Sequence, residues 1–136
     1  MEGEEYDCFP LKWTSYGQIM DEAGVDYFCY ENSYNWPTTN DFQWFDQYIN
    51  APQNSSMYQR CMNFDGPNAI ETFIARAGNG TLPEVSYLFS PGAMQEHPPY
   101  TVQDGEYFTR QIIEAIINGP AYNETLFFLT YDGKTG

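Results

Sequence analysis

The chain has 136 residues, which is enough for one domain with a hydrophobic core. It carries 19 acidic and 5 basic residues, and the resulting formal charge of −14 would repel both a nucleic-acid backbone and an anionic membrane surface. An aromatic content of 18% excludes a disordered chain, and no apolar run reaches the roughly 20 residues of a membrane span.

Hydrophobic spacing predicts an alternation of helices and strands. Apolar residues repeat at helical spacing in four stretches, whereas short aromatic or β-branched runs indicate three strands. In chain order we expect a helix from an N-cap at Thr14 to Gly24, a strand over 25–30, a helix over 42–49 capped by Asp41, a loop over 51–56, a helix from Pro67 that ends at Gly78-Asn79-Gly80, a strand over 84–90, a helix over 102–118 and a strand over 125–131.

The second half of the chain has the clearest patterns. TLFFLTY (125–131) is apolar almost throughout, as expected of a strand covered on both faces. The element order predicts an α/β fold of three layers with a mostly parallel sheet. Three strands are few for such a sheet, so we expect the fold to be incomplete within these residues. The side chains of the last helix that are predicted to face inward are Phe108, Ile112, Ile113, Ile116 and Ile117.

Several features favour a part of a longer secreted protein. N-x-S/T sequons occur at Asn54, Asn79 and Asn123, each in a polar stretch expected to be a surface loop that can be glycosylated. The three cysteines are an odd number, so one disulfide would leave one thiol over. The first ten residues, MEGEEYDCFP, have neither a basic nor an apolar region and are not expected to form a signal peptide.

Two titratable residues stand at predicted strand ends. His97, the only histidine, lies with Glu96 in the loop after 84–90, and Asp132 directly follows 125–131. If these strands are parallel, both residues emerge at the sheet edge where α/β proteins bind ligands. A carboxylate there can hold a divalent cation, and an imidazole can bind a metal, act as a general acid or donate to an oxyanion. The plainer alternatives are a solvated histidine and a turn-forming aspartate, with Thr101 capping the next helix.

Three stretches of the chain resemble, in order, segments of the phosphoesterase family of secreted fungal acid phosphatases and bacterial phospholipases C. These stretches are KWTSYGQIMDEAGVDYFCYEN, TLPEVSYLFSPGAMQEHPPY and NGPAYNETLFFLTYD. The first is similar to a helix, an AGV turn and an aromatic strand of the family, the second to its E-H-P-P loop, and the third to its last strand with a terminal aspartate. The resemblance covers about residues 10–132.

The resemblance implies an alkaline-phosphatase-like α/β fold and a hydrolase acting on phosphoric esters. The substrate would be a small phosphoester or a phospholipid headgroup, and the enzyme would use a divalent metal ion. Asp132 stands at the position of the metal-binding aspartate in the Y-D-E motif of the family. His97 stands at the position of the active-site histidine of E-H-P-P.

The chain also departs from the family pattern. Where the family continues Y-D-E-x-G-G and then D-H-V, the sequence reads TYDGKTG, so Gly133 replaces an acidic ligand and the later histidine is missing. Glu31-Asn32-Ser33 is similar to the E-N-x-S-F-D metal motif but aligns elsewhere in the family, so metal binding is not assigned to it. We therefore expect residues 1–136 to form one partial domain with an incomplete active site. The alternative is a catalytically inactive secreted protein that acts as a binding module.

Overall fold

The computed structural model describes residues 9–31, 40–62 and 68–131. Within these ranges the chain forms five α-helices, two 3₁₀-helices and two strands. In chain order they are α1 (Tyr16–Glu22), β1 (Tyr27–Tyr30), η2 (Asp41–Trp44), α2 (Asp46–Ile49), α3 (Ser56–Cys61), α4 (Ala69–Asn79), β2 (Val85–Leu88), α5 (Val102–Ile117) and η3 (Tyr122–Glu124).

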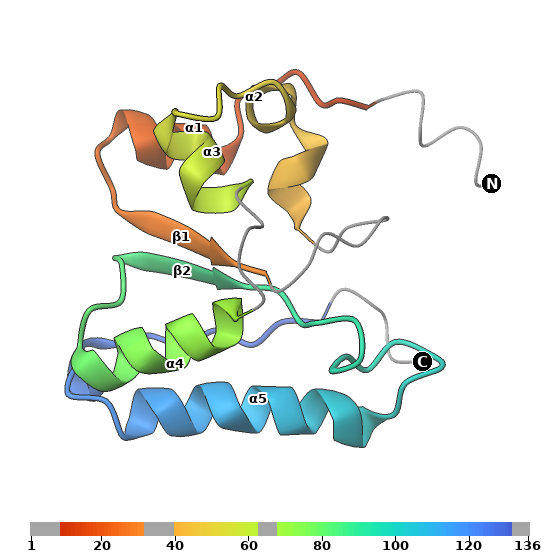
Figure 1. The fold of residues 1–136 in the computed structure, drawn as a ribbon, viewed down its shortest axis with the longest axis vertical. Helices are drawn as coiled ribbons and strands as arrows, with labels where there is room; N and C mark the ends of the chain where they lie inside the picture. Colours follow the sequence, from red (N-terminus) through yellow and green to blue (C-terminus); the bar gives the residue numbers. More distant parts are fainter. Residues whose placement is uncertain (1–8, 32–39, 63–67, 132–136) are drawn as a thin grey trace.

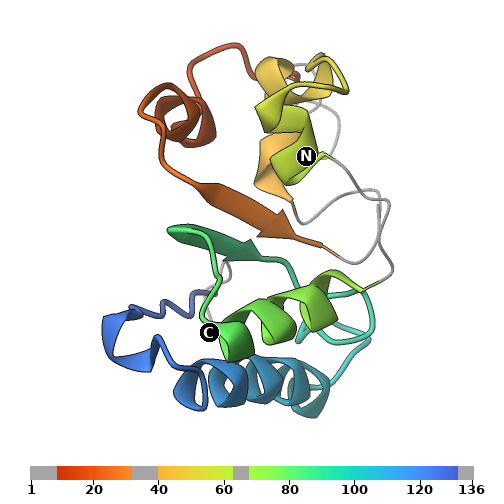
Figure 2. The ribbon, with the colours of Figure 1, turned by 60° about the vertical axis from the view of Figure 1, so that its left-hand side comes forward.

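The two strands form a parallel pair with helices on both of its faces (Figures 1 and 2). Tyr27 pairs with Val85, and Tyr30 pairs with Leu88. Figure 1 shows α1, α2 and α3 on one side of the strands and α4 and α5 on the other. The predicted α/β class and the parallel strand direction are therefore confirmed for the described part of the chain.

β1 is buried on both faces because its side chains alternate between two hydrophobic cores. Tyr27 and Cys29 enter the core shared with α1, α2 and α3, whereas Tyr30 enters the core shared with α4 and α5. The buried members of the first core are Met20, Tyr27, Cys29, Phe42, Tyr48 and Cys61. Those of the second are Tyr30, Ile70, Phe73, Ala77, Phe108, Ile112 and Ile116.

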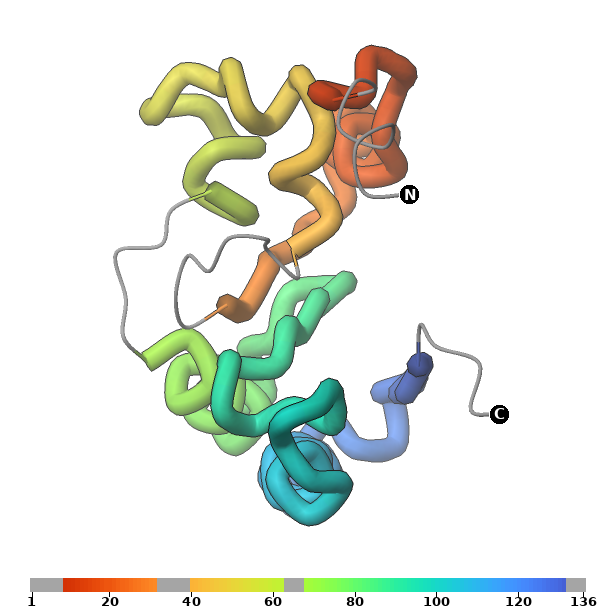
Figure 3. Tube along the Cα trace, turned by 90° about the vertical axis from the view of Figure 1, so that its right-hand side faces the viewer, coloured from red at the N-terminus to blue at the C-terminus, as the bar shows by residue number. Residues whose placement is uncertain are grey.

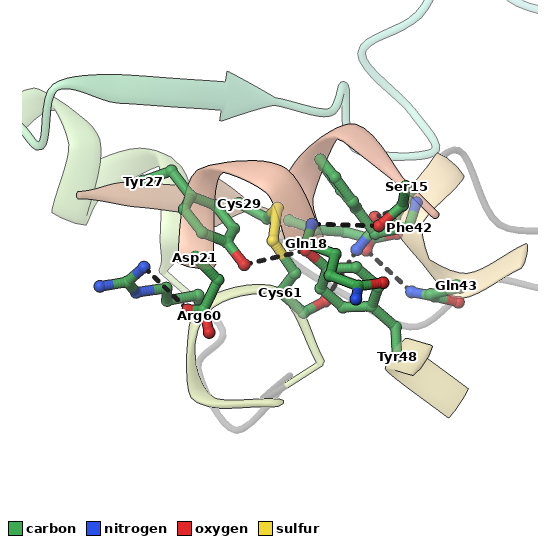
Figure 4. Close-up of a disulfide and its surroundings, with 12 residues drawn as sticks. Ser15, Gln18, Asp21, Tyr27, Cys29, Phe42, Gln43, Tyr48, Arg60 and Cys61 are labelled. Carbon is green, nitrogen blue, oxygen red and sulfur yellow. Dashed lines mark hydrogen bonds and ion pairs between the residues drawn. A yellow bond between two sulfur atoms is a disulfide. The ribbon is translucent and has the colours of Figure 1, made fainter. Parts of the chain in front are cut away.

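A disulfide between Cys29 and Cys61 joins β1 to α3 inside the first core (Figure 4). Beside it, the hydroxyls of Tyr27 and Tyr48 lie 2.9 Å apart, and burial raises the pKa of both phenols. Arg60 lies over the Tyr27 ring, with its guanidinium carbon 4.7 Å from the ring centroid. The sequence allowed one bridge, and the structure forms it; Cys8 lies outside the described residues.

The first two helices differ in detail from the prediction. Ser15, and not Thr14, caps α1 by accepting a hydrogen bond from the Gln18 backbone N–H at 3.1 Å. The expected helix over 42–49 is split into η2 and α2, because Phe45 is extended there and pairs with Leu11. Leu11 N donates to Trp44 O, and Asp46 N donates to Leu11 O, so residues far away in the sequence interrupt the helix.

Two further differences concern local caps. The side chain that caps η2 is that of Asn40, which accepts from the Phe42 N–H at 3.1 Å. Helix α3 was not predicted. It begins at Ser56, the last residue of the stretch that was expected to be a loop. Its signal is Ser55, whose hydroxyl accepts from the Tyr58 N–H at 3.3 Å and so caps the helix.

The helix stops at Gly24 and at Gly80 follow the prediction. Both glycines have positive backbone φ angles, 71° and 68°, which residues other than glycine rarely adopt. α4 and α5 lie close to their predicted ranges. In α5, however, Ile117 is 52% exposed and does not face the core as expected.

The prediction of a strand over 125–131 is wrong for the described residues. Residues 126–131 make no backbone hydrogen bond to another described residue, and Leu126 and Phe128 are 77% and 75% exposed. A strand is stabilised by a neighbour that pairs with its backbone, and β2 pairs only with β1 in the described sheet. The apolar pattern of residues 125–131 does not show whether a neighbouring strand is present to pair with them.

We predict that removing the disulfide destabilises the fold strongly. The bridge spans 32 residues, and the chain-entropy relation assigns a loop of that size about 3–4 kcal/mol. Urea unfolding of a Cys29→Ala/Cys61→Ala double variant should therefore show a lower free energy of unfolding than the parent chain. A reductant should lower the urea midpoint of the parent and leave that of the double variant unchanged. Equal midpoints for oxidised and reduced parent would contradict the prediction.

Candidate functional site

The loop that carries His97 leaves the carboxyl end of β2. Because β1 and β2 are parallel, their carboxyl ends lie at the same edge of the sheet, as the arrowheads in Figure 1 show. Residues 89–101 connect β2 to α5 at this edge. This is the position where open α/β sheets bind ligands, so His97 lies in a loop suited to a site.

His97 is exposed, and one of its ring nitrogens is fixed by a local contact. Nδ1 lies 2.7 Å from the carbonyl oxygen of Pro98. A carbonyl oxygen can only accept, so Nδ1 carries the proton in this hydrogen bond. The neutral ring therefore presents Nε2 as a base or metal ligand, and the protonated ring presents a second N–H donor.

The end of the same loop is anchored to α5 by a polar cap. The carboxylate of Asp104 accepts hydrogen bonds from the backbone N–H and the hydroxyl of Thr101, both at 2.8 Å. The bond from the Thr101 backbone lowers the pKa of Asp104, and the hydroxyl lowers it further. Thr101 thus stands at the start of the helix, as the sequence predicted, and Asp104 stabilises that start.

Glu96, next to His97, connects the loop to two distant parts of the chain. It packs directly against Gly105 in α5, where a methyl group on the glycine would overlap the Glu96 side chain. Its Oε1 accepts a hydrogen bond from the Tyr131 hydroxyl at 3.2 Å, and this bond raises the pKa of Tyr131. The loop after β2 therefore lies against the end of the 125–131 segment, which Figure 3 shows in dark blue.

An open groove of about 430 Å³ lies between α5 and this segment. Three glutamates line it, together with the Arg110 guanidinium, whose Nε donates to Glu114 at 2.7 Å. His97 does not line the groove, although the neighbouring Glu96 does. Its lining residues are Glu96, Glu106, Thr109, Arg110, Ile113, Glu114, Leu129 and Tyr131.

The predicted partner of His97, Asp132, lies outside the described residues. Its preceding residue, Tyr131, contacts the residue that precedes His97. The structure therefore brings the neighbours of the two predicted site residues together, at the expected edge of the sheet. A common cleft for His97 and Asp132 stays a prediction.

Glu31, the acidic residue of the E-N-S stretch to which metal binding was not assigned, is a buried carboxylate at the same edge. Glu31 directly follows β1, is 8% exposed and accepts a hydrogen bond from Gln43 Nε2 at 3.2 Å. Gln43 Oε1 is itself buried and makes no hydrogen bond to a described residue. The sequence offered two signals, the likeness of Glu31-Asn32-Ser33 to a metal motif and the position of an acidic residue directly after a strand. It does not show that this side chain is buried.

The three sequon asparagines are all exposed, as expected of glycosylation acceptors. Asn54 lies in a turn before α3. Asn79 is the last residue of α4, and Asn123 lies in η3, so these two belong to helix ends and turns and not to irregular loops. Each of the three asparagine side chains is therefore accessible to solvent.

Within residues 9–31, 40–62 and 68–131, no three His, Cys, Asp or Glu side chains lie together in a way that could hold a metal ion. No helix there has the length and apolar character needed to cross a bilayer.

Comparison with known proteins gives one family match and several relatives. The model of the Phosphoesterase family matches residues 4–136. The chain is 28% identical to the hemolytic phospholipase C of Pseudomonas aeruginosa, over 93% of the chain and 20% of that protein. It is 27% identical to the non-hemolytic phospholipase C of Burkholderia pseudomallei, over 91% of the chain and 21% of that protein.

A shorter match extends to plants. Non-specific phospholipase C4 of Arabidopsis thaliana is 37% identical over 49 residues, which are 36% of this chain and 9% of that protein. The chain spans about a fifth of the length of the two bacterial relatives.

The cap at the start of α5 generates a prediction for pH. The folded-state pKa of Asp104 lies below the ordinary value of 3.8, so its stabilising effect is present above pH 4 and is lost as the pH falls through the folded-state pKa. Asp104→Asn should therefore unfold at lower urea than the parent at pH 7, and the difference should shrink as the pH falls below about 4. Glu71→Gln, an exposed acid without a side-chain cap at the start of α4, is the control. A constant gap between pH 7 and pH 3 would contradict the assignment.

Proposed function

This chain belongs to the phosphoesterase family, and we propose that it is part of a hydrolase that cleaves phosphoric ester bonds. The observation that carries the proposal is the family match over residues 4–136. The position of the E-H-P-P loop at the carboxyl edge of a parallel sheet supports it, because that is where α/β enzymes place their catalytic groups.

The substrate class that we favour is the headgroup ester of a phospholipid. Two bacterial relatives that cover more than nine-tenths of the chain are named phospholipase C. A small water-soluble phosphoester is the other substrate that the family resemblance implies. The two are distinguished by comparing phospholipid vesicles with p-nitrophenyl phosphate as substrates.

We assign His97 the role of contacting the transferred phosphoryl group. Its Nδ1–H donates to the adjacent Pro98 carbonyl, which fixes the ring and leaves Nε2 as the reactive atom. A protonated Nε2 can donate to a phosphoryl oxygen as negative charge develops there. An exposed ring in a loop can reach a substrate without rearrangement of the core.

We propose that Asp132 binds a divalent metal ion, on the family resemblance alone. The described residues gather no three metal-binding side chains, so they do not form such a site by themselves. Further ligands would have to come from other parts of the protein. A bound divalent ion would supply positive charge to the phosphate.

The domain proposal follows from the unpaired 125–131 segment. We propose that residues 1–136 form one part of a three-layer alkaline-phosphatase-like domain. The exposed apolar side chains of residues 126–131, Leu126 and Phe128 above all, support this proposal, because they leave an apolar surface that a further part of such a domain would cover. The share of each bacterial relative that the chain matches, about a fifth, supports it further.

We propose that the protein is secreted and glycosylated at Asn54, Asn79 and Asn123. All three sequons are exposed, and the Cys29–Cys61 disulfide is a bond that persists in oxidising compartments.

A binding module without catalysis is the second candidate. Large apolar side chains are exposed around α1, where Trp13 and Tyr16 are 63% and 66% exposed. Such side chains are enriched at interaction surfaces. The two candidates differ in whether His97 affects turnover.

We predict that His97→Ala lowers kcat for phosphoester hydrolysis about 10²–10³-fold in the complete protein, because one donor to the developing charge is removed. Asp132→Ala should abolish the dependence of turnover on added divalent cations. The measurement is hydrolysis of phospholipid vesicles and of p-nitrophenyl phosphate, with and without a chelator. Tyr100→Phe, a change in the same loop, is the control and should retain the parental kcat. Full turnover of His97→Ala would remove the catalytic assignment, and no turnover of the parent would favour the binding module.

Glycosylation gives a separate prediction. Each of Asn54→Gln, Asn79→Gln and Asn123→Gln, expressed through a eukaryotic secretory pathway, should lose the mass of one glycan. Asn118→Gln, an exposed asparagine outside any sequon, should keep the parental mass. A parent whose mass is unchanged by a glycan-removing enzyme would contradict the proposal.

A further inference from the structure

Gly105 is a buried glycine in the first half of α5, a place where alanine is normally more stabilising. Backbone conformation does not explain it, because the described glycines with positive φ are Gly24 and Gly80. Space does explain it: a methyl group at residue 105 would overlap Cγ of Glu96 and lie 2.9 Å from its Oε1. The absence of a side chain at Gly105 therefore leaves the space on the surface of α5 that the Glu96 side chain occupies.

The same carboxylate reaches a third segment. Glu96 Oε1 accepts from the Tyr131 hydroxyl at 3.2 Å, across 35 positions of the sequence. Glu96 is half-buried, whereas the Tyr131 side chain is 60% exposed, so the acid is the better fixed of the two. Glu96 directly precedes His97, and Tyr131 directly precedes Asp132.

We propose that Glu96 is a positioning residue that holds the His97 loop against α5 and against the segment leading to Asp132. We call Glu96, Gly105 and Tyr131 the Glu96 clamp. The catalytic meaning of the clamp rests on the proposed function, whereas the clamp itself is a contact that can be tested without any substrate.

The clamp acts by joining two segments whose other described hydrogen bonds near His97 and Tyr131 are local or absent. His97 itself is exposed and contacts its own neighbour Pro98, and residues 126–131 make no backbone hydrogen bond to another described residue. The Glu96 side chain holds the loop by its packing against Gly105 together with the 3.2 Å hydrogen bond from Tyr131. Loss of the clamp would leave the imidazole with a wider range of positions, and misplacement of a catalytic group lowers kcat.

A thermal double-variant cycle tests the contact with Gly105. Gly105→Ala should lower the Tm in the parent, because the methyl group displaces Glu96. In a Glu96→Ala background the same change should raise the Tm, by about 2–4 °C, because alanine then only favours the helix. Gly78→Ala is the matched control: nothing lies within 4 Å of the added methyl group, and it should raise the Tm in both backgrounds.

The single histidine gives a direct signal of positioning. The imidazole resonances of His97 in NMR spectra should shift in Tyr131→Phe and in Glu96→Ala. Tyr107→Phe, which removes an exposed hydroxyl of α5 with no hydrogen bond to a described residue, should leave them unchanged. In turnover, Tyr131→Phe and Glu96→Ala should lower kcat about tenfold with little change in KM. Glu96→Gln keeps an acceptor for the Tyr131 hydroxyl and should restore most of kcat.

The outcomes separate the clamp from the reaction. A Gly105→Ala effect of the same sign in both backgrounds would overturn the clamp, as would unchanged His97 resonances in Tyr131→Phe and Glu96→Ala. If the cycle and the resonances behave as expected while His97→Ala retains full turnover, the clamp is established and the proposed function fails. If both readouts and kcat follow the expectation, Glu96 positions the catalytic loop.

Discussion

The structure depends on the burial of β1 on both of its faces. Tyr27 and Cys29 are packed against one set of helices and Tyr30 against the other, so a four-residue strand holds two cores together. Burial of aromatic side chains is the largest stabilising contribution that such a short strand can make. The disulfide from Cys29 to Cys61 adds a covalent tie to this point. The edge of the sheet is thereby fixed, and so is the place where the loop after β2 begins.

The proposed site is built outward from that edge with progressively weaker contacts. β2 pairs with β1 through backbone hydrogen bonds, the Thr101–Asp104 cap fixes the start of α5, and Glu96 connects the loop to α5 and to Tyr131. His97 stands at the outer end of this series, exposed and fixed through Nδ1 only. A rigid base with an exposed reactive group is a common arrangement for loops that bind substrates.

Local patterns were predictable from the sequence, and contacts between distant residues were not. α4 and α5 follow from the spacing of their apolar residues and from the glycine that ends α4. The break at Phe45 depends on Leu11, and the failure of 125–131 to form a strand depends on a missing partner. For the site, the position of His97 after a strand was readable. The Glu96–Tyr131 bond was not, because it joins residues 35 positions apart.

The charge of the chain bears on how a phosphoester could be held. A net charge of −14 produces a field that repels a phosphate at long range, so attraction must come from contacts close to the site. The groove beside Glu96 increases the difficulty, because three of its lining residues are glutamates and its one arginine is paired with Glu114. A protonated His97 supplies one positive charge in this region. A divalent cation would supply two more, and for this reason the proposed metal at Asp132 and the role of His97 support each other physically. Without that cation, an anionic substrate would meet a surface that is itself negatively charged and would be repelled by it.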